Sequence, residues 1–65
     1  MPNDVFLEFH SIGAFVRVTA IDPVSGVEVV LQGPASAGEK ALGDAAIRKL
    51  QYVLTKRAAE KDGER

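Results

Sequence analysis

The sequence has no cysteine and no tryptophan, and it has only three prolines, three phenylalanines and one tyrosine in 65 residues. Without cysteine the chain has no disulfide framework, no thiolate metal site and no thiol nucleophile. A domain of this length lies near the lower limit for folding without such cross-links. The absence of cysteine suits a reducing compartment, so we expect a cytoplasmic protein that folds on a marginal core.

An excess of charge of either sign is also lacking. Eight basic side chains stand against nine acidic ones, for a net charge of -1, which removes the broad attraction that a general nucleic-acid binder uses. The N-terminus shows no basic segment followed by an apolar one, so we expect no signal peptide. The longest uncharged stretch, residues 29–38, is interrupted by Gly33 and Pro34, and we expect no membrane-spanning segment.

The first half of the chain alternates apolar and polar residues with the period of β-strands. The predicted strands are residues 5–10, 14–21 and 27–32. Their apolar positions agree on one face, which indicates an antiparallel meander covered on one side only.

Turn chemistry connects these strands. Ile12–Gly13 is predicted as the first two-residue turn because glycine accepts a positive φ. This placement sets His10 opposite Phe15 and Glu8 opposite Arg17. Residues 22–26, Asp-Pro-Val-Ser-Gly, have a typical turn composition and are predicted as the second turn.

The second half of the chain is rich in helix-forming residues with a period near 3.6. A helix is predicted over residues 37–59, begun by a capping box in which Ser36 caps the first turn and Glu39 reaches back. Gly43 lies on the apolar arc and is predicted to mark a close approach of the helix and sheet backbones. Residues 60–65 are charged and are predicted to be a disordered tail. The fold class is therefore α+β, a single two-layer β-β-β-α domain over residues 1–65.

The sheet face turned away from the helix is expected to carry several large apolar side chains that the chain itself does not cover. Such residues stabilise half-exposed strands, and they also form contact surfaces. We favour a protein interface, in its simplest form self-association as a homodimer, with another protein as the other possible partner. The predicted interface residues are Phe6, Phe15, Arg17, Ile21 and Val30.

One side of the predicted helix combines basic residues with an aromatic. Basic groups around an aromatic ring bind phosphate and stack on a base, although late cations on a helix also favour its C-terminal dipole. A nucleic-acid-binding module is therefore the alternative function. The residues of this basic stripe are Arg48, Lys49, Tyr52 and Lys56.

Catalytic and cofactor sites are not predicted. His10 is the only histidine, and its neighbour Ser11 points to the opposite face of a strand, so the two cannot act as base and nucleophile. The glycine-rich segment 33–38 lacks the Gly-Lys-Ser/Thr ending of a phosphate-binding loop. We expect a non-enzymatic protein without a cofactor or a metal.

The segment from Phe6 to Arg57 resembles a family of short bacterial proteins, mostly alphaproteobacterial, that is classed as a domain of unknown function. The resemblance implies a self-contained domain and no particular activity. The residues that carry it are 6–9 (Phe-Leu-Glu-Phe), 16–23 (Val-Arg-Val-Thr-Ala-Ile-Asp-Pro), 33–35 (Gly-Pro-Ala) and 47–54 (Ile-Arg-Lys-Leu-Gln-Tyr-Val-Leu).

The predicted order of three strands, a glycine-rich turn and a helix is also similar to the later part of a double-stranded RNA-binding domain. In that family a pair of lysines at the helix start meets phosphates. The matching segment here, residues 36–40, has one lysine beside a glutamate, and the family's first helix has no counterpart. The resemblance therefore extends to the order of elements and not to the RNA contacts.

Overall fold

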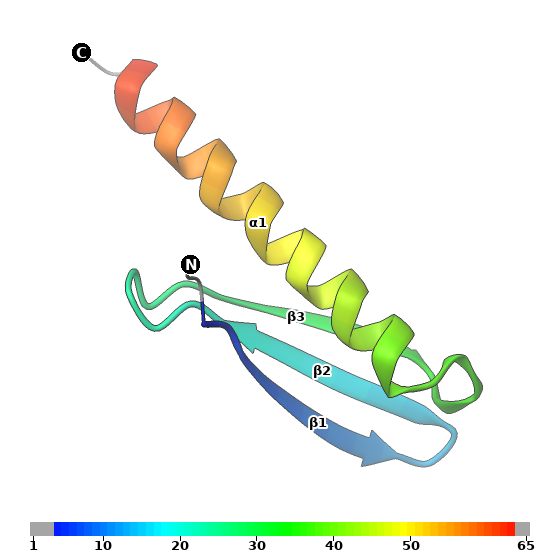
Figure 1. The fold of residues 1–65 in the computed structure, drawn as a ribbon. Coiled ribbons are helices and arrows are strands. Elements are labelled where there is room, and N and C mark those ends of the chain that lie inside the picture. Colours follow the sequence, from blue (N-terminus) through cyan, green and yellow to red (C-terminus); the bar gives the residue numbers. More distant parts are fainter. Residues whose placement is uncertain (1–3, 64–65) are drawn as a thin grey trace.

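The computed structural model describes residues 4–63 and has two layers, a three-stranded sheet and one long helix (Figure 1). The sheet is antiparallel with the order β1-β2-β3, so β1 and β3 are both edge strands. The α+β class and the β-β-β-α order are confirmed. The elements are β1 (Phe6–Ile12), β2 (Phe15–Ile21), β3 (Glu28–Pro34), a 3-10 helix η1 (Ala35–Ala37) and α1 (Glu39–Gly63).

The first hairpin turns one residue later than predicted. Ile12 pairs with Phe15, so the two turn residues are Gly13 and Ala14, and Gly13 has a φ of +59°. A turn with glycine in its first central position needs a positive φ only there. A turn centred on Ile12–Gly13 would ask a β-branched residue to take that conformation.

The later turn changes the cross-strand partners. His10 lies opposite Arg17 and Glu8 lies opposite Thr19, so the predicted pairs His10–Phe15 and Glu8–Arg17 are wrong. The shift moves partners by two residues and leaves each residue on its predicted face.

The second turn is confirmed and is held by side chains. The Ser25 hydroxyl donates to Asp22 Oδ2 at 2.7 Å, and the Ser25 N–H donates to the same oxygen at 3.2 Å. The Ser25 hydroxyl oxygen also accepts from the Val27 N–H at 3.1 Å. Gly26 closes the turn with a φ of +79°.

The helix begins later and ends later than predicted. Ser36 lies inside η1, Gly38 follows with a φ of +89°, and the Leu42 N–H donates to the Gly38 carbonyl. The α-helix therefore starts after a glycine, and the predicted Ser36–Glu39 capping box is not formed. At the other end α1 continues to Gly63, so residues 60–63 are helical; the remainder of the predicted tail, residues 64–65, lies outside the described residues.

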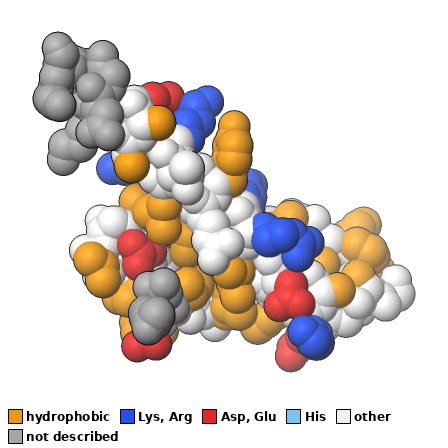
Figure 2. Space-filling view, turned by 45° about the horizontal axis from the view of Figure 1, so that its top comes forward, with side chains coloured by type: hydrophobic (Ala, Val, Ile, Leu, Met, Phe, Trp, Pro, Cys, Tyr) orange, Lys and Arg blue, Asp and Glu red, His pale blue; other side chains and the backbone are white. Residues whose placement is uncertain are grey.

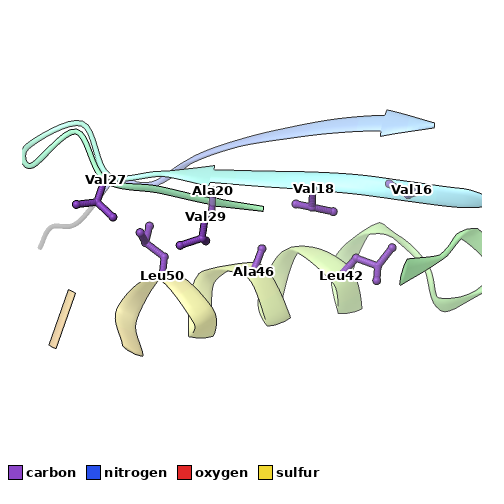
Figure 3. Packing of buried hydrophobic residues seen from close by; sticks show 8 residues of the cluster. All are labelled: Val16, Val18, Ala20, Val27, Val29, Leu42, Ala46 and Leu50. Atoms are coloured by element: carbon purple, nitrogen blue, oxygen red, sulfur yellow. The ribbon is translucent and has the colours of Figure 1, made fainter. Parts of the chain in front are cut away.

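The core lies between the sheet and the first half of α1, as Figure 3 shows. The buried residues of the sheet all lie on the face predicted to meet the helix, and Val18 and Leu50 are fully buried. The prediction is wrong for the β1 end of this face, where Leu7 is half-buried and Phe9 is exposed. Val53 and Leu54, farther along α1, are half-buried and pack against this cluster. Figure 1 shows the C-terminal end of the helix lying away from the sheet. The buried residues are Val16, Val18, Ala20, Val27, Val29, Leu42, Ala46 and Leu50.

Two glycines mark where the layers approach. A Cβ at Gly33 would lie 2.6 Å from Leu42 Cδ2, and a Cβ at Gly43 would lie 3.3 Å from Leu7 Cδ1 and 3.4 Å from Phe9 Cζ. The neighbours of Gly43 are side chains of β1, so the helix does not approach the sheet backbone there as predicted. At Gly33 the backbone of β3 instead lies against the Leu42 side chain of the helix. The described helix is not apolar enough over a sufficient length to cross a membrane.

Candidate interaction surface

The face of the sheet opposite α1 has no second layer over it among the described residues (Figure 1). Strand register arranges this open face in four rows across β1, β2 and β3. The two end rows are mainly apolar and the two middle rows mainly polar. In order along the strands the rows are Phe6–Ile21–Glu28, Glu8–Thr19–Val30, His10–Arg17–Gln32 and Ile12–Phe15–Pro34.

The predicted interface residues all lie on this face, but the structure does not bring all of them together. Phe6 and Ile21 are direct cross-strand partners, and Val30 lies in the neighbouring row. Phe15 is three rows away from Ile21 at the other end of β2, with Arg17 between them. The surface therefore has two apolar ends separated by a polar band.

Sequence reasoning missed two members of the second apolar end. The sequence pattern predicts Ile12 in the turn and Pro34 after the third strand, whereas both pair with Phe15 across neighbouring strands. The signal was present in Gly13, because glycine at the first central position of a turn keeps the preceding residue in the strand. Ile12 is 40% exposed and adds to the apolar area around Phe15.

Exposure of the large apolar side chains is high on the open face. Phe6 is 58% exposed, Phe15 is 50% exposed and Val30 is 47% exposed. Removal of large apolar side chains from water is favourable in free energy. Exposed clusters of such side chains therefore often mark the contact sites of a domain. The open face is therefore the strongest candidate for binding another protein surface.

The predicted basic stripe on α1 is divided by the structure. The Lys49 ammonium group donates to the Val30 carbonyl at 2.8 Å, so this side chain lies against the edge of β3. Tyr52 is 66% exposed, and Arg48 and Lys56 are also exposed. In Figure 2 the Lys and Arg side chains are spread over the surface in several separate places.

A hollow of 290 Å³ lies at the end of the sheet, beside the middle of α1. Four of its lining side chains are aliphatic. Its one carboxylate, Asp22, accepts hydrogen bonds from Ser25, and these hold the pKa of Asp22 below its usual value. The lining residues are Val5, Asp22, Val24, Leu50, Gln51 and Leu54.

The acidic side chains and His10 do not form a metal-binding cluster in the part of the chain that the structure describes. His10 is exposed on the open face between Glu8 and Ile12 along β1, with Arg17 as its cross-strand partner. Among the side chains of residues 4–60, no three His, Asp or Glu groups gather closely enough to hold a metal ion.

Comparison with known proteins identifies a family but no activity. The profile of a family described as a domain of unknown function, DUF6898, matches residues 2–57. No curated protein and no solved structure matches the chain. Because the match covers most of its length, the chain belongs to the DUF6898 family.

Proposed function

We propose that this member of the DUF6898 family is a small non-enzymatic protein-interaction module that forms a homodimer through its open sheet face. The observation that carries the proposal is the exposure of Phe6, Phe15 and Val30 on a face that no other described element covers. Packing a second copy on this face gives a marginal core a second layer of apolar contacts.

The order of the rows favours one way of pairing two such faces. A two-fold axis parallel to the strands would set Arg17 against Arg17 of the second copy. The other two-fold axis lies in the plane between the two sheets and runs perpendicular to the strands. This axis reverses the order of the rows, so it sets Ile21 over Phe15 of the second copy and Arg17 over Thr19 of the second copy. The second arrangement joins apolar ends and separates like charges, so we propose it as the dimer geometry.

The area of the open face limits the affinity that we expect for the dimer. Three strands of seven residues span about 24 Å by about 14 Å. A contact of this size lies at the small end of specific interfaces, and we expect a dissociation constant in the micromolar range or weaker. The dimer should therefore be sought at submillimolar concentrations.

Sedimentation velocity with a charge placed on the face tests the proposal. Phe15→Asp puts a carboxylate in the apolar end of the surface, and we expect it to halve the sedimenting mass while the circular dichroism spectrum stays unchanged. Val24→Asp is the matched control, because Val24 is 93% exposed and lies in the β2–β3 turn, outside the open face. A wild-type monomer at submillimolar concentration, or equal masses for the two variants, would overturn the proposal.

The cellular setting is part of the same proposal. The resemblance to short alphaproteobacterial proteins supports a bacterial protein, and we propose that it acts in the cytoplasm. Another protein on the same face is the other partner that this surface allows.

A nucleic-acid-binding module remains the alternative function. The exposed Tyr52 beside Arg48 and Lys56 supports it, whereas Lys49 is engaged with the sheet edge. Titration of labelled single- and double-stranded oligonucleotides at low salt tests this alternative, which predicts binding that weakens as salt is added.

A further inference from the structure

β1 is an edge strand, so its backbone forms hydrogen bonds with β2 along one side and has no neighbouring strand along the other side. Ile12 and Phe15 flank a two-residue turn, so they form a hydrogen-bonded pair, and such pairs alternate along an antiparallel ladder. The residues of β1 that bond to β2 are Phe6, Glu8, His10 and Ile12. The residues whose N–H and C=O groups point to the free edge are therefore Leu7, Phe9 and Ser11.

Two other contacts support this alternation. The Ala35 N–H donates to the Ala14 carbonyl, which places the even-numbered residues of β2 toward β3. The even-numbered residues of β3 then point away from β2, and the carbonyl of one of them, Val30, is the group that accepts from Lys49. The same rule assigns Leu7, Phe9 and Ser11 to the open edge.

The β1 edge lacks the lysine, proline and bulge that commonly protect an edge strand from pairing, and Glu8 is its one charged side chain. Edge strands of soluble proteins are protected by lysine, proline, bulges or a covering side chain. β1 has the sequence Phe-Leu-Glu-Phe-His-Ser-Ile, and among the described residues no side chain forms a hydrogen bond with its backbone. Within the described part of the chain, the outward-pointing backbone groups of β1 therefore have no hydrogen-bond partner.

This strand is complementary to itself. If a two-fold axis passes through Phe9, the central residue of Phe6–Ile12, all seven residues pair with a second copy. Glu8 then lies opposite His10 of the second copy, and Phe6 lies opposite Ile12 of the second copy. Like-charge pairs across strands are destabilising and apolar pairs are stabilising, and the Glu8 carboxylate can accept a hydrogen bond from the imidazole N–H of His10 of the second copy.

Neighbouring registers lose this match. A shift of two residues one way sets Glu8 against Glu8 of the second copy, and a shift the other way sets His10 against His10. Each shift also leaves residues unpaired at both ends. We infer that β1 pairs antiparallel with β1 of a second copy, in the register centred on Phe9, to form one six-stranded sheet.

The position of α1 leaves room for this pairing. The helix packs mainly on β2 and β3, and both helices of the pair would lie on the same face of the joined sheet. Phe9, which is 36% exposed beside Gly43, would meet Phe9 of the second copy on the helix side of the junction. Burial of this ring adds apolar contact to the backbone hydrogen bonds.

The inference rests on the proposed function as a self-associating module, but it uses a different surface. Edge pairing leaves the open face free, so the two contacts are compatible and together would join four copies. Each contact has its own variants, and failure of one can be distinguished from failure of the other.

Amide hydrogen exchange followed by NMR reads the edge directly. In a monomer, or in a dimer formed through the open face alone, the amides of Leu7, Phe9 and Ser11 have no strand partner and exchange fast. In the edge pair these three amides donate across the junction, and their exchange should slow about tenfold when nine-tenths of the chain is paired. The amides of Glu8 and His10 serve as the internal reference because they bond to β2 in either case.

Substitution of Ser11 is the second test of edge pairing. Ser11→Pro removes a donor that points to the free edge, and edge strands accept proline. We expect association to weaken by about tenfold or more relative to Ser11→Ala, since a donor is lost on each copy. Circular dichroism of both variants checks that the fold is retained.

The outcomes are separable. Slow exchange at the three amides together with weakened association of Ser11→Pro supports edge pairing, whatever Phe15→Asp does. Fast exchange at all protein concentrations, or equal association of Ser11→Pro and Ser11→Ala, overturns it while leaving the open-face dimer to its own test. Protection that arises only when a different protein is added also overturns the assignment of a second copy.

Discussion

The two edges of the sheet have strands of equal length, seven residues each, and they differ in how they are covered. The β3 edge ends in Gly33–Pro34, and Lys49 from the helix binds its Val30 carbonyl. The β1 edge has neither proline nor lysine. The β3 edge is thus partly covered within the chain, and the absence of such cover on β1 is what motivates the proposed edge pairing.

Packing of the helix follows the same asymmetry. On the β3 side, Leu42 lies so close to Gly33 that a Cβ there would be 2.6 Å from Leu42 Cδ2. On the β1 side, Gly43 faces Leu7 and Phe9 at ordinary to tight contact distances, and both of these side chains are partly exposed. The β3 side should therefore tolerate added volume poorly and the β1 side should tolerate it well.

The largest predicted effect tests this packing difference. Gly33→Val adds a side chain that strands normally favour, yet it must displace the buried Leu42, and we expect the free energy of unfolding to fall by about 1–3 kcal/mol. Gly43→Ala is the matched change on the β1 side. There the gain in helix propensity should outweigh a small shift of Leu7 and raise the free energy of unfolding by about 0.5 kcal/mol.

Urea unfolding of both variants measures the two values. A Gly33→Val protein as stable as the wild type would show that the β3 side has room to spare. A destabilised Gly43→Ala protein would show that β1 and the helix are packed as tightly as β3 and the helix. Either result removes the packing difference between the two sides.

Much of this fold is predictable from residue periodicity. Val16, Val18 and Ala20 alternate with Arg17 and Thr19, and the structure buries the predicted set. Parity decides which face a strand residue occupies, so an error of one residue in the first turn changed cross-strand partners without changing faces. The fold class followed from these patterns and from the helical period after Gly38.

Features that depend on exact backbone conformation were less predictable. The spacing of Ser36 and Glu39 suits a capping box, but Gly38 takes a positive φ and η1 occupies the preceding residues. The role of Lys49 was also hidden, because a basic residue on a helix gives no sign in sequence that its ammonium group reaches a strand 19 residues earlier. The residues of the open face were predictable from strand periodicity. Their division into two apolar ends was not, because it depends on the pairing register of the three strands.

A smaller effect tests the cover on the β3 edge. Lys49→Met keeps the aliphatic stem and removes the ammonium donor to the Val30 carbonyl. The contact is exposed to solvent, so we expect the free energy of unfolding to fall by only about 0.5 kcal/mol. Lys56→Met, a change of the same kind farther along the helix, is the control and should have no effect in the same urea titration; equal values for the two variants would argue that Lys49 does not stabilise this edge.

The smallest predicted effect is a pH dependence of stability that arises in the β2–β3 turn. The two turns of the sheet differ in what holds them. The β1–β2 turn depends on Gly13, whereas in the β2–β3 turn Ser25 donates two hydrogen bonds to Asp22 and lowers the pKa of this carboxyl group. A carboxyl group whose pKa is lower in the folded than in the unfolded state stabilises the fold above its unfolded pKa, about 3.9, and loses this contribution as the pH falls through the folded value.

The stability difference between the wild type and Asp22→Asn should therefore be constant from pH 7 to about pH 5 and shrink as the pH falls below about 4. Urea midpoints measured for both proteins between pH 7 and pH 2 test this, and a difference that is independent of pH would show that the charge of Asp22 does not stabilise the β2–β3 turn.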